Sequence, residues 1–118
     1  FDHFAVRYEY ADGTPLLSMC RQIDGTASRV EEILHGTRGT LLTRHGWSQI
    51  TGASPWQTEG ITNPYVTEIA DLVRSIRGDG PYLNEAVRVA ESTLTAIMGR
   101  MSAYTGQEVT WDQAMNSA

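Results

Sequence analysis

The stretch Phe4-Ala5-Val6-Arg7-Tyr8-Glu9-Tyr10 alternates apolar and polar residues without a break. Strict alternation is typical of a half-buried β-strand, because successive side chains point to opposite faces. One face of this strand carries Phe4, Val6, Tyr8 and Tyr10. Asp12-Gly13 follows and predicts a hairpin, since glycine accepts a positive φ. We expect the return strand over residues 16–23, with Leu17, Met19 and Arg21 on one side.

Working outward, three more strands are expected, at about 28–35, 41–44 and 47–51. Gly36-Thr37-Arg38-Gly39 has the glycines of a turn between the first two of them. Residues 52–62 contain Pro and Gly without any hydrophobic period and predict a loop. Strands joined by such short turns indicate an antiparallel meander.

The second half of the chain is predicted to be helical. Asn63 suits a helix N-cap and Pro64 a first helical position, while Gly78-Asp79-Gly80-Pro81 ends the helix. Apolar residues recur at helical spacing at Val66, Ile69, Ala70, Val73 and Ile76. The sequence therefore predicts one amphipathic helix here.

A longer helix is expected from Leu83 or Asn84 to about Tyr104, ended by Gly106. Its apolar stripe is Ala86, Val89, Ala90, Thr93, Leu94, Ile97, Met98 and Met101. Roughly twenty residues give a rod about 30 Å long, enough to cross a small sheet. Thr110-Trp111-Asp112-Gln113 has the form of a capping box and predicts a last short helix.

Strands followed by helices predict an α+β fold, with an open, mainly antiparallel β-sheet and helices packed on one face. The 118 residues are enough for a single domain, residues 1–118. Because the chain starts at Phe1 and reads straight into a strand, we expect it to be a piece of a longer protein.

The composition excludes several functions. All nine cationic residues are Arg, so no Schiff-base lysine, lysine base or P-loop lysine comes from this chain. The net charge of −5 argues against a nucleic-acid partner, and no apolar stretch is long enough to span a membrane. Cys20 is the single cysteine, so an intrachain disulfide is excluded.

Catalytic and metal motifs are not found in the sequence. His3, His35 and His45 do not pair at metal-ligand spacing, so we predict no metal site. Glu31 and Glu32 are adjacent on a strand and face opposite ways, which excludes an acid–base pair. Cys20 lies within a predicted strand and is expected to be a small buried hydrophobe.

One pair of residues is a candidate for substrate binding. Arg21 and Gln22 end the second strand, where a guanidinium and an amide would reach a carboxylate or phosphate at the sheet edge. The alternative, which general experience of exposed charges favours, is a cross-strand ion pair of Arg21 with Glu9 or Glu31. Trp47, Trp56 and Trp111 suit a sugar or protein contact as well as packing.

Several motifs resemble one known family. They are Phe4–Tyr10 with Asp12-Gly13, Ser18–Gln22, Gly36–Thr40, Asn63–Val66, Asn84–Ala86, Ala90–Thr93, Tyr104–Gly106 and Val109–Trp111. Together they resemble the C-terminal domain of the glucose–fructose oxidoreductase / inositol dehydrogenase (Gfo/Idh/MocA) family. The resemblance implies a dihydrodipicolinate-reductase-like C-terminal domain, whose open sheet packs against another subunit.

The resemblance also implies an N-terminal Rossmann domain that binds NAD or NADP and is not in this sequence. The family's catalytic lysine lies in a Glu-Lys-Pro motif, and its catalytic histidine on a helix ahead of these strands; this chain has neither. We therefore expect no catalytic and no cofactor-binding residue here, and a fragment that is inert alone.

The parent is expected to be a homo-oligomer, cytoplasmic or periplasmic, acting on a sugar, a polyol or a derivative. The alternative is a freestanding α+β module for dimerisation or small-ligand binding, without hydride chemistry.

Overall fold

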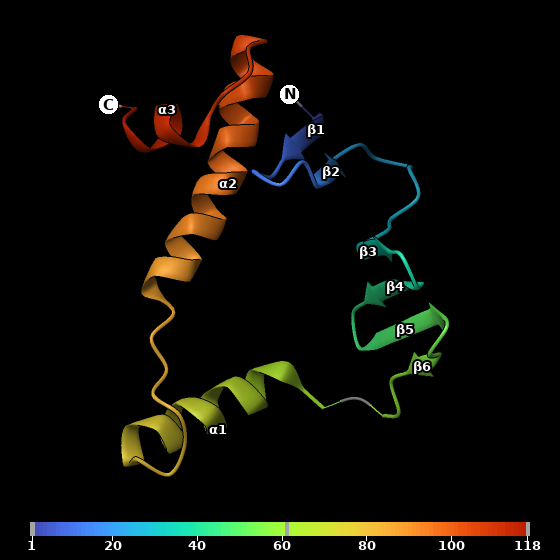
Figure 1. Cartoon of the computed structure of the whole chain (residues 1–118), viewed down its shortest axis with the longest axis vertical. Helices are drawn as coiled ribbons and strands as arrows, with labels where there is room; N and C mark the ends of the chain where they lie inside the picture. Colours follow the sequence, from blue (N-terminus) through green and yellow to red (C-terminus); the bar gives the residue numbers. More distant parts are fainter. Residues whose placement is uncertain (1, 61, 118) are drawn as a thin grey trace. The chain divides into compact units, whose positions relative to one another are not determined.

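The computed structural model describes residues 2–60 and 62–117 (Figure 1). The chain divides into two compact units. Phe1–Thr26 and Asn84–Ala118 make up the first unit, and Ala27–Leu83 the second. Each unit is described by itself. Both contain antiparallel strands and helix, so the α+β class predicted from the sequence is confirmed.

The first unit begins with the predicted hairpin. β1 (His3–Glu9) pairs antiparallel with β2 (Pro15–Arg21), so the return strand ends two residues earlier than expected. The turn is the Asp12-Gly13 turn of the sequence: Gly13 has a φ of 82°, and the Thr14 amide donates to Asp12 Oδ1 at 2.9 Å. That hydrogen bond lowers the pKa of Asp12.

The second unit begins with a four-stranded antiparallel meander. Its strands, in order, are β3 (Glu31–Gly36), β4 (Gly39–Arg44), β5 (Trp47–Gly52) and β6 (Trp56–Gln57). The Gly36–Gly39 turn is confirmed, because these two residues are partners in the β3–β4 ladder.

Three sequence predictions about the strands are wrong. β3 starts three residues later than expected, and the predicted loop 52–62 contains β6. The strands also form two sheets, β1-β2 and β3-β4-β5-β6, where one open sheet was expected. Residues 22–30, which separate β2 from β3, make no ladder, so hydrophobic alternation within each strand does not define which strands pair.

Helix α1 (Pro64–Arg77) follows in the second unit, as predicted. The Asn63 side chain accepts a hydrogen bond from the Tyr65 amide, and Pro64 occupies the first turn. Gly78 ends the helix in the left-handed conformation at φ 79°, which glycine adopts without a Cβ penalty. Every side chain of the apolar stripe predicted for this helix is exposed.

Helix α2 (Ala86–Thr105) and helix α3 (Trp111–Met115) belong to the first unit. Helix α2 starts two or three residues later than predicted and ends at Gly106 as expected. The Thr110–Gln113 capping box is confirmed in both directions. Only the C-terminal half of the α2 stripe is partly covered, at Leu94, Met98 and Met101, so burial of the whole stripe was a wrong expectation.

The β1 face of the hairpin packs on α2 (Figure 1). Tyr8 Oη donates to the Thr95 carbonyl at 3.0 Å, and burial raises the pKa of Tyr8. Gly99 is buried against the Tyr8 ring, where a Cβ would clash with Tyr8 Oη. Phe4 stacks on Tyr104 with ring centroids 6.2 Å apart. The small residue in α2 is thus what lets an aromatic strand face approach the helix.

Within residues 2–60 and 62–117, no helix is both long and apolar enough to cross a membrane.

Candidate functional site

The strand register of the second unit aligns four apolar side chains across all four strands. Leu34 pairs with Leu41, Leu41 with Ile50, and Ile50 with Trp56. Residues that face each other across a ladder point to the same side of the sheet. We call Leu34, Leu41, Ile50 and Trp56 the apolar row.

The apolar row is largely uncovered. Leu34 is 57% and Trp56 54% exposed, Ile50 is exposed, and Leu41 is half-buried. Next to it on the same side run Gly36, Gly39 and Gly52, which are paired across β3, β4 and β5. A Cβ at Gly39 would clash with the Thr51 carbonyl, so glycine is needed where these strands approach each other. Because glycine has no side chain, nothing projects from the sheet beside the apolar row at these positions.

The opposite side of the same sheet carries a cluster of ion pairs around Glu31. Glu31 accepts from Arg29 Nε and Arg44 Nε, both at 3.0 Å, and its side chain is only 9% exposed. The Arg44 guanidinium carbon lies 5.9 Å from the centroid of the Trp47 ring. Because both carboxylate oxygens are bound, Glu31 is an unsuitable general base, and this cluster stabilises the sheet.

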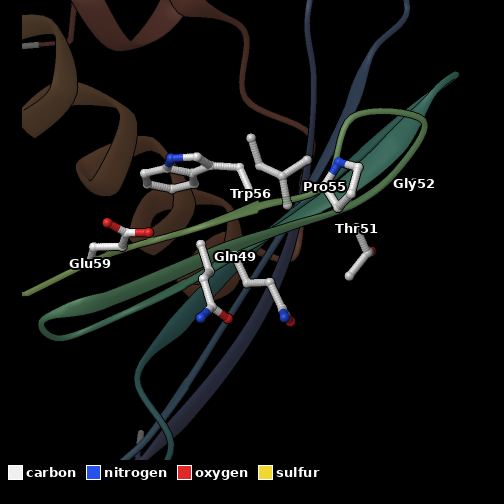
Figure 2. Close-up of a pocket in the computed structure, with 8 residues that line it drawn as sticks. Gln49, Thr51, Gly52, Pro55, Trp56 and Glu59 are labelled. Carbon is white, nitrogen blue, oxygen red and sulfur yellow. The ribbon is translucent and has the colours of Figure 1, made fainter.

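A shallow groove of about 490 Å³ runs along β5 and β6 (Figure 2). Figure 2 shows Trp56 and Pro55 on one side of the strands, and Gln49 and Thr51 on the other. The ladder agrees, since Gln49 pairs with Gln57 while Ile50 pairs with Trp56. A ring stacked on Trp56 would therefore lie across the strands from the Gln49 amide, which does not make a pocket for one small ligand.

The candidate residues Arg21 and Gln22 lie at the open end of the hairpin. Arg21 is the last residue of β2 and faces His3, and the Gln22 amide donates to the Asp2 carbonyl at 2.7 Å. Both side chains are exposed. The structure thus places the two residues together at a strand end, as the sequence predicts, and their role in substrate binding stays a prediction.

The alternative ion pair of Arg21 with Glu9 is wrong. Glu9 faces Pro15 at the turn end of the hairpin, about 20 Å along the strand from Arg21. Its carboxylate binds Arg7 at 3.1 Å. Glu31, the other partner considered, binds Arg29 and Arg44.

The hairpin also leaves one face uncovered. Leu17 and Met19 share a face with Arg21, and their exposed fractions are 62% and 69%. Cys20 lies on the other face, opposite Phe4, and it too is exposed, because α2 packs on β1 and not on β2; this corrects the expectation of a buried hydrophobe.

The remaining reactive side chains do not gather into a site. Asp2 Oδ1 and His3 Nδ1 are 2.7 Å apart, and this hydrogen bond lowers the pKa of Asp2. His35 Nδ1 lies 3.2 Å from the Thr40 hydroxyl. Among the residues that the structure describes, no group of three His, Cys, Asp or Glu side chains is placed to hold a metal ion.

The chain exposes 10223 Å² of surface. Two separate compact units, each of about half the mass, would together expose about 7,700 Å². The excess of roughly 2,500 Å² shows that the two units together leave surface that compact domains of this size would bury. The apolar row is the part of that surface that the register defines best.

Comparison of the chain with known protein families, with curated proteins and with solved structures finds no match. The fold and the surfaces described above therefore carry the functional argument. The apolar row was not predicted from the sequence. Part of it could have been predicted from the Gly36–Gly39 turn, because pairing of Gly36 with Gly39 makes Leu41 the ladder partner of Leu34.

Proposed function

We propose that this chain is the C-terminal substrate-site and oligomerisation portion of an NAD(P)-dependent oxidoreductase that acts on a sugar, a polyol or a derivative. The observation that carries the proposal is the uncovered apolar row on a four-stranded antiparallel sheet. An open sheet with an apolar face suits assembly with a second subunit. The resemblance of the motifs to the Gfo/Idh/MocA C-terminal domain supports the enzyme class.

The chain's own share in that enzyme is binding and assembly. The sequence has no lysine and no G-x-G-x-x-G turn, so its residues do not fit a dinucleotide, and an N-terminal domain of the parent would hold NAD or NADP. The cofactor, when bound there, would accept or donate the hydride. The Arg21 guanidinium and the Gln22 amide, both exposed at one strand end, would orient the substrate.

The direct test of the enzyme class is the coding sequence upstream of Phe1. We expect a strand, a glycine-rich turn and a helix, the pattern that binds a dinucleotide pyrophosphate. An unrelated upstream region would overturn the proposal. The chain alone is expected to give no heat with NAD or NADP in calorimetry, and micromolar binding would contradict this assignment.

The role of Arg21 is tested in the intact parent enzyme. Arg21→Ala is expected to lower kcat/KM by tenfold or more with an unchanged melting temperature. Arg7→Ala is the matched control, because Arg7 is on the same hairpin and its guanidinium binds Glu9. Equal kinetics for the two variants would remove Arg21 from the substrate site.

A second candidate function is a freestanding module for dimerisation or small-ligand binding, without hydride chemistry. The exposed Trp56 indole is the observation that favours it, because an uncovered aromatic ring suits contact with a second protein or stacking with a ring (Figure 2). The two functions differ in the upstream sequence. Tryptophan fluorescence also distinguishes them, because only a ligand-binding module would show a shift of the Trp56 emission when a ligand is added to this chain alone.

A further inference from the structure

The sequence contains three Asp-Gly pairs, at Asp12-Gly13, Asp24-Gly25 and Asp79-Gly80. An aspartate followed by glycine can rearrange without an enzyme, because glycine has no Cβ to hinder its own backbone nitrogen. That nitrogen attacks the side-chain carboxyl of the aspartate and closes a five-membered ring. The three pairs share this chemistry, so differences in reactivity between them come from the structure around each pair.

The Asp12-Gly13 pair is held by hydrogen bonds at both reacting groups. The Gly13 amide donates to the Tyr10 carbonyl at 2.8 Å, and Asp12 Oδ1 accepts from the Thr14 amide at 2.9 Å. The hydrogen bond from Thr14 also lowers the pKa of Asp12 and so favours the ionised carboxylate, which is the poorer target for a nucleophile. This pair is therefore protected by the hairpin turn.

The Asp79-Gly80 pair is restrained by the end of α1. The Asp79 amide donates to the Arg74 carbonyl at 2.9 Å, in the turn that follows the helix. Gly80 is half-buried, and a Cβ placed on it would lie 3.3 Å from Arg74 Cβ. Ring closure requires rotation of the backbone and side chain of the aspartate, so these contacts slow it.

The Asp24-Gly25 pair lies in the segment between β2 and β3 and is the least restrained of the three. Both residues are exposed, and a Cβ on Gly25 would meet no atom within 4 Å. Within the part of the chain that the structure describes, the Asp24 carboxylate and the Gly25 amide have no hydrogen-bond partner. The Thr26 hydroxyl donates to the Ile23 carbonyl at 2.8 Å, and this bond spans the pair without engaging either reacting group.

We propose that Asp24-Gly25 is a site of spontaneous isoaspartate formation in this protein. The Gly25 nitrogen bonds to Asp24 Cγ while a Cγ–O bond of the protonated carboxyl breaks, and the amide proton leaves with the hydroxyl as water. Water then opens the resulting succinimide at either carbonyl. Cleavage of the bond between the nitrogen and the main-chain carbonyl carbon of Asp24 gives isoaspartate, whereas cleavage of the bond to Cγ restores aspartate.

The modification changes the connection between β2 and β3. Isoaspartate carries the main chain through Cβ and Cγ, so this connection becomes longer by one methylene group, and the former main-chain carbonyl becomes a free carboxylate. Asp24 lies two residues after Gln22, so the change falls beside the candidate substrate residues. The rearrangement needs neither of those residues and does not rest on the proposed function.

Peptide mapping of the intact wild-type chain tests the proposal. The chain is incubated for several weeks at physiological temperature and mildly acidic pH, where more of each carboxyl is protonated than at neutral pH. Trypsin cleaves after Arg and places the three pairs in separate peptides, residues 8–21, 22–29 and 78–88. Electron-transfer fragmentation then distinguishes isoaspartate from aspartate. We expect at least fivefold more isoaspartate at Asp24 than at Asp12, and at least twofold more than at Asp79.

The matched control is the same chain incubated in concentrated urea, which removes the contacts of the folded state. The three pairs should then differ by less than twofold, because only their neighbours in the sequence remain. Isoaspartate at Asp24 that does not exceed the amount at the other two pairs in the folded chain would overturn the proposal. A ranking that persists unchanged in urea would equally overturn it, because the preference would then not come from the structure.

Discussion

The β1-β2 hairpin and the four-stranded sheet differ in what lies on their apolar faces. In the first unit, Phe4 and Tyr8 are held by α2, through a stacked ring on Tyr104 and a hydrogen bond to the Thr95 carbonyl. In the second unit, the described part of its own helix, α1, does not pack on the apolar row. Both regions are antiparallel and pack their strands alike, so the difference lies in the helix and its small residue, Gly99.

The two regions therefore have different roles, one in stability and one in association. The hairpin side is a small core whose stability is internal to the unit. The sheet is held by its ladder and by the Glu31 ion pairs, and its apolar row remains available for assembly. Substitutions in the first region should therefore change stability, and those in the second should change association.

The largest effect is expected at the hairpin–helix contact. Gly99→Val should destabilise the first unit by about 2–3 kcal/mol, because a larger side chain displaces Tyr8 from the helix. Ala96→Val, at an exposed position of α2, is the matched control and should cost less than about 0.5 kcal/mol. Urea unfolding followed by circular dichroism measures both, and equal losses would show that α2 does not depend on the hairpin.

A smaller effect is expected from the Tyr8 hydroxyl. Tyr8→Phe removes the bond to the Thr95 carbonyl and should cost about 1 kcal/mol. Thermal melts of the two proteins at pH 7 measure the loss.

The same hydroxyl makes stability depend on alkaline pH. Because the folded-state pKa of Tyr8 is raised above its ordinary value of 10.0, its contribution is complete below pH 10 and is lost as the pH rises through the folded pKa. Melting temperatures across this window should fall less in Tyr8→Phe than in the wild type. Identical slopes would assign the alkaline loss to other groups.

The smallest effect is expected in the sheet. Arg44→Gln removes one of the two guanidiniums on Glu31 and should cost about 0.5–1 kcal/mol, less in high salt, because Arg29 remains and Arg44 is itself half exposed. Melts at low and high salt measure this change. A loss above about 3 kcal/mol would mean that the sheet has a charged core and would remove the contrast with the hairpin.

Local features were predicted well because each rests on neighbouring residues. The Asn63 cap, the Gly78 and Gly106 helix ends and the Thr110–Gln113 capping box all need only a few adjacent side chains. The Asp12-Gly13 and Gly36–Gly39 turns are of the same kind. Features that depend only on neighbouring residues can therefore be predicted from the sequence.

Long-range features were predicted less well. Alternation shows that β2 and β3 are strands, but it does not say that they belong to different sheets, and two-residue β6 is too short to show a period. Cys20 was expected inside because apolar strand residues usually find a covering layer, and here α2 packs on β1 and not on β2. Arg21 and Gln22 lie at the end of β2, although the strand was expected to reach Ile23, and their role in substrate binding stays a prediction.

The central claim is that the apolar row is an assembly surface, and sedimentation equilibrium of the chain tests it directly. Leu34→Arg places a charge in the row, and Ile33→Arg places the same charge on the opposite side of the same strand, where residue 33 is about as exposed. We predict that the wild type associates with rising concentration and that Leu34→Arg weakens the dimer at least tenfold, while Ile33→Arg stays within twofold of the wild type. A strictly monomeric wild type, or equal weakening by both variants, would contradict the account.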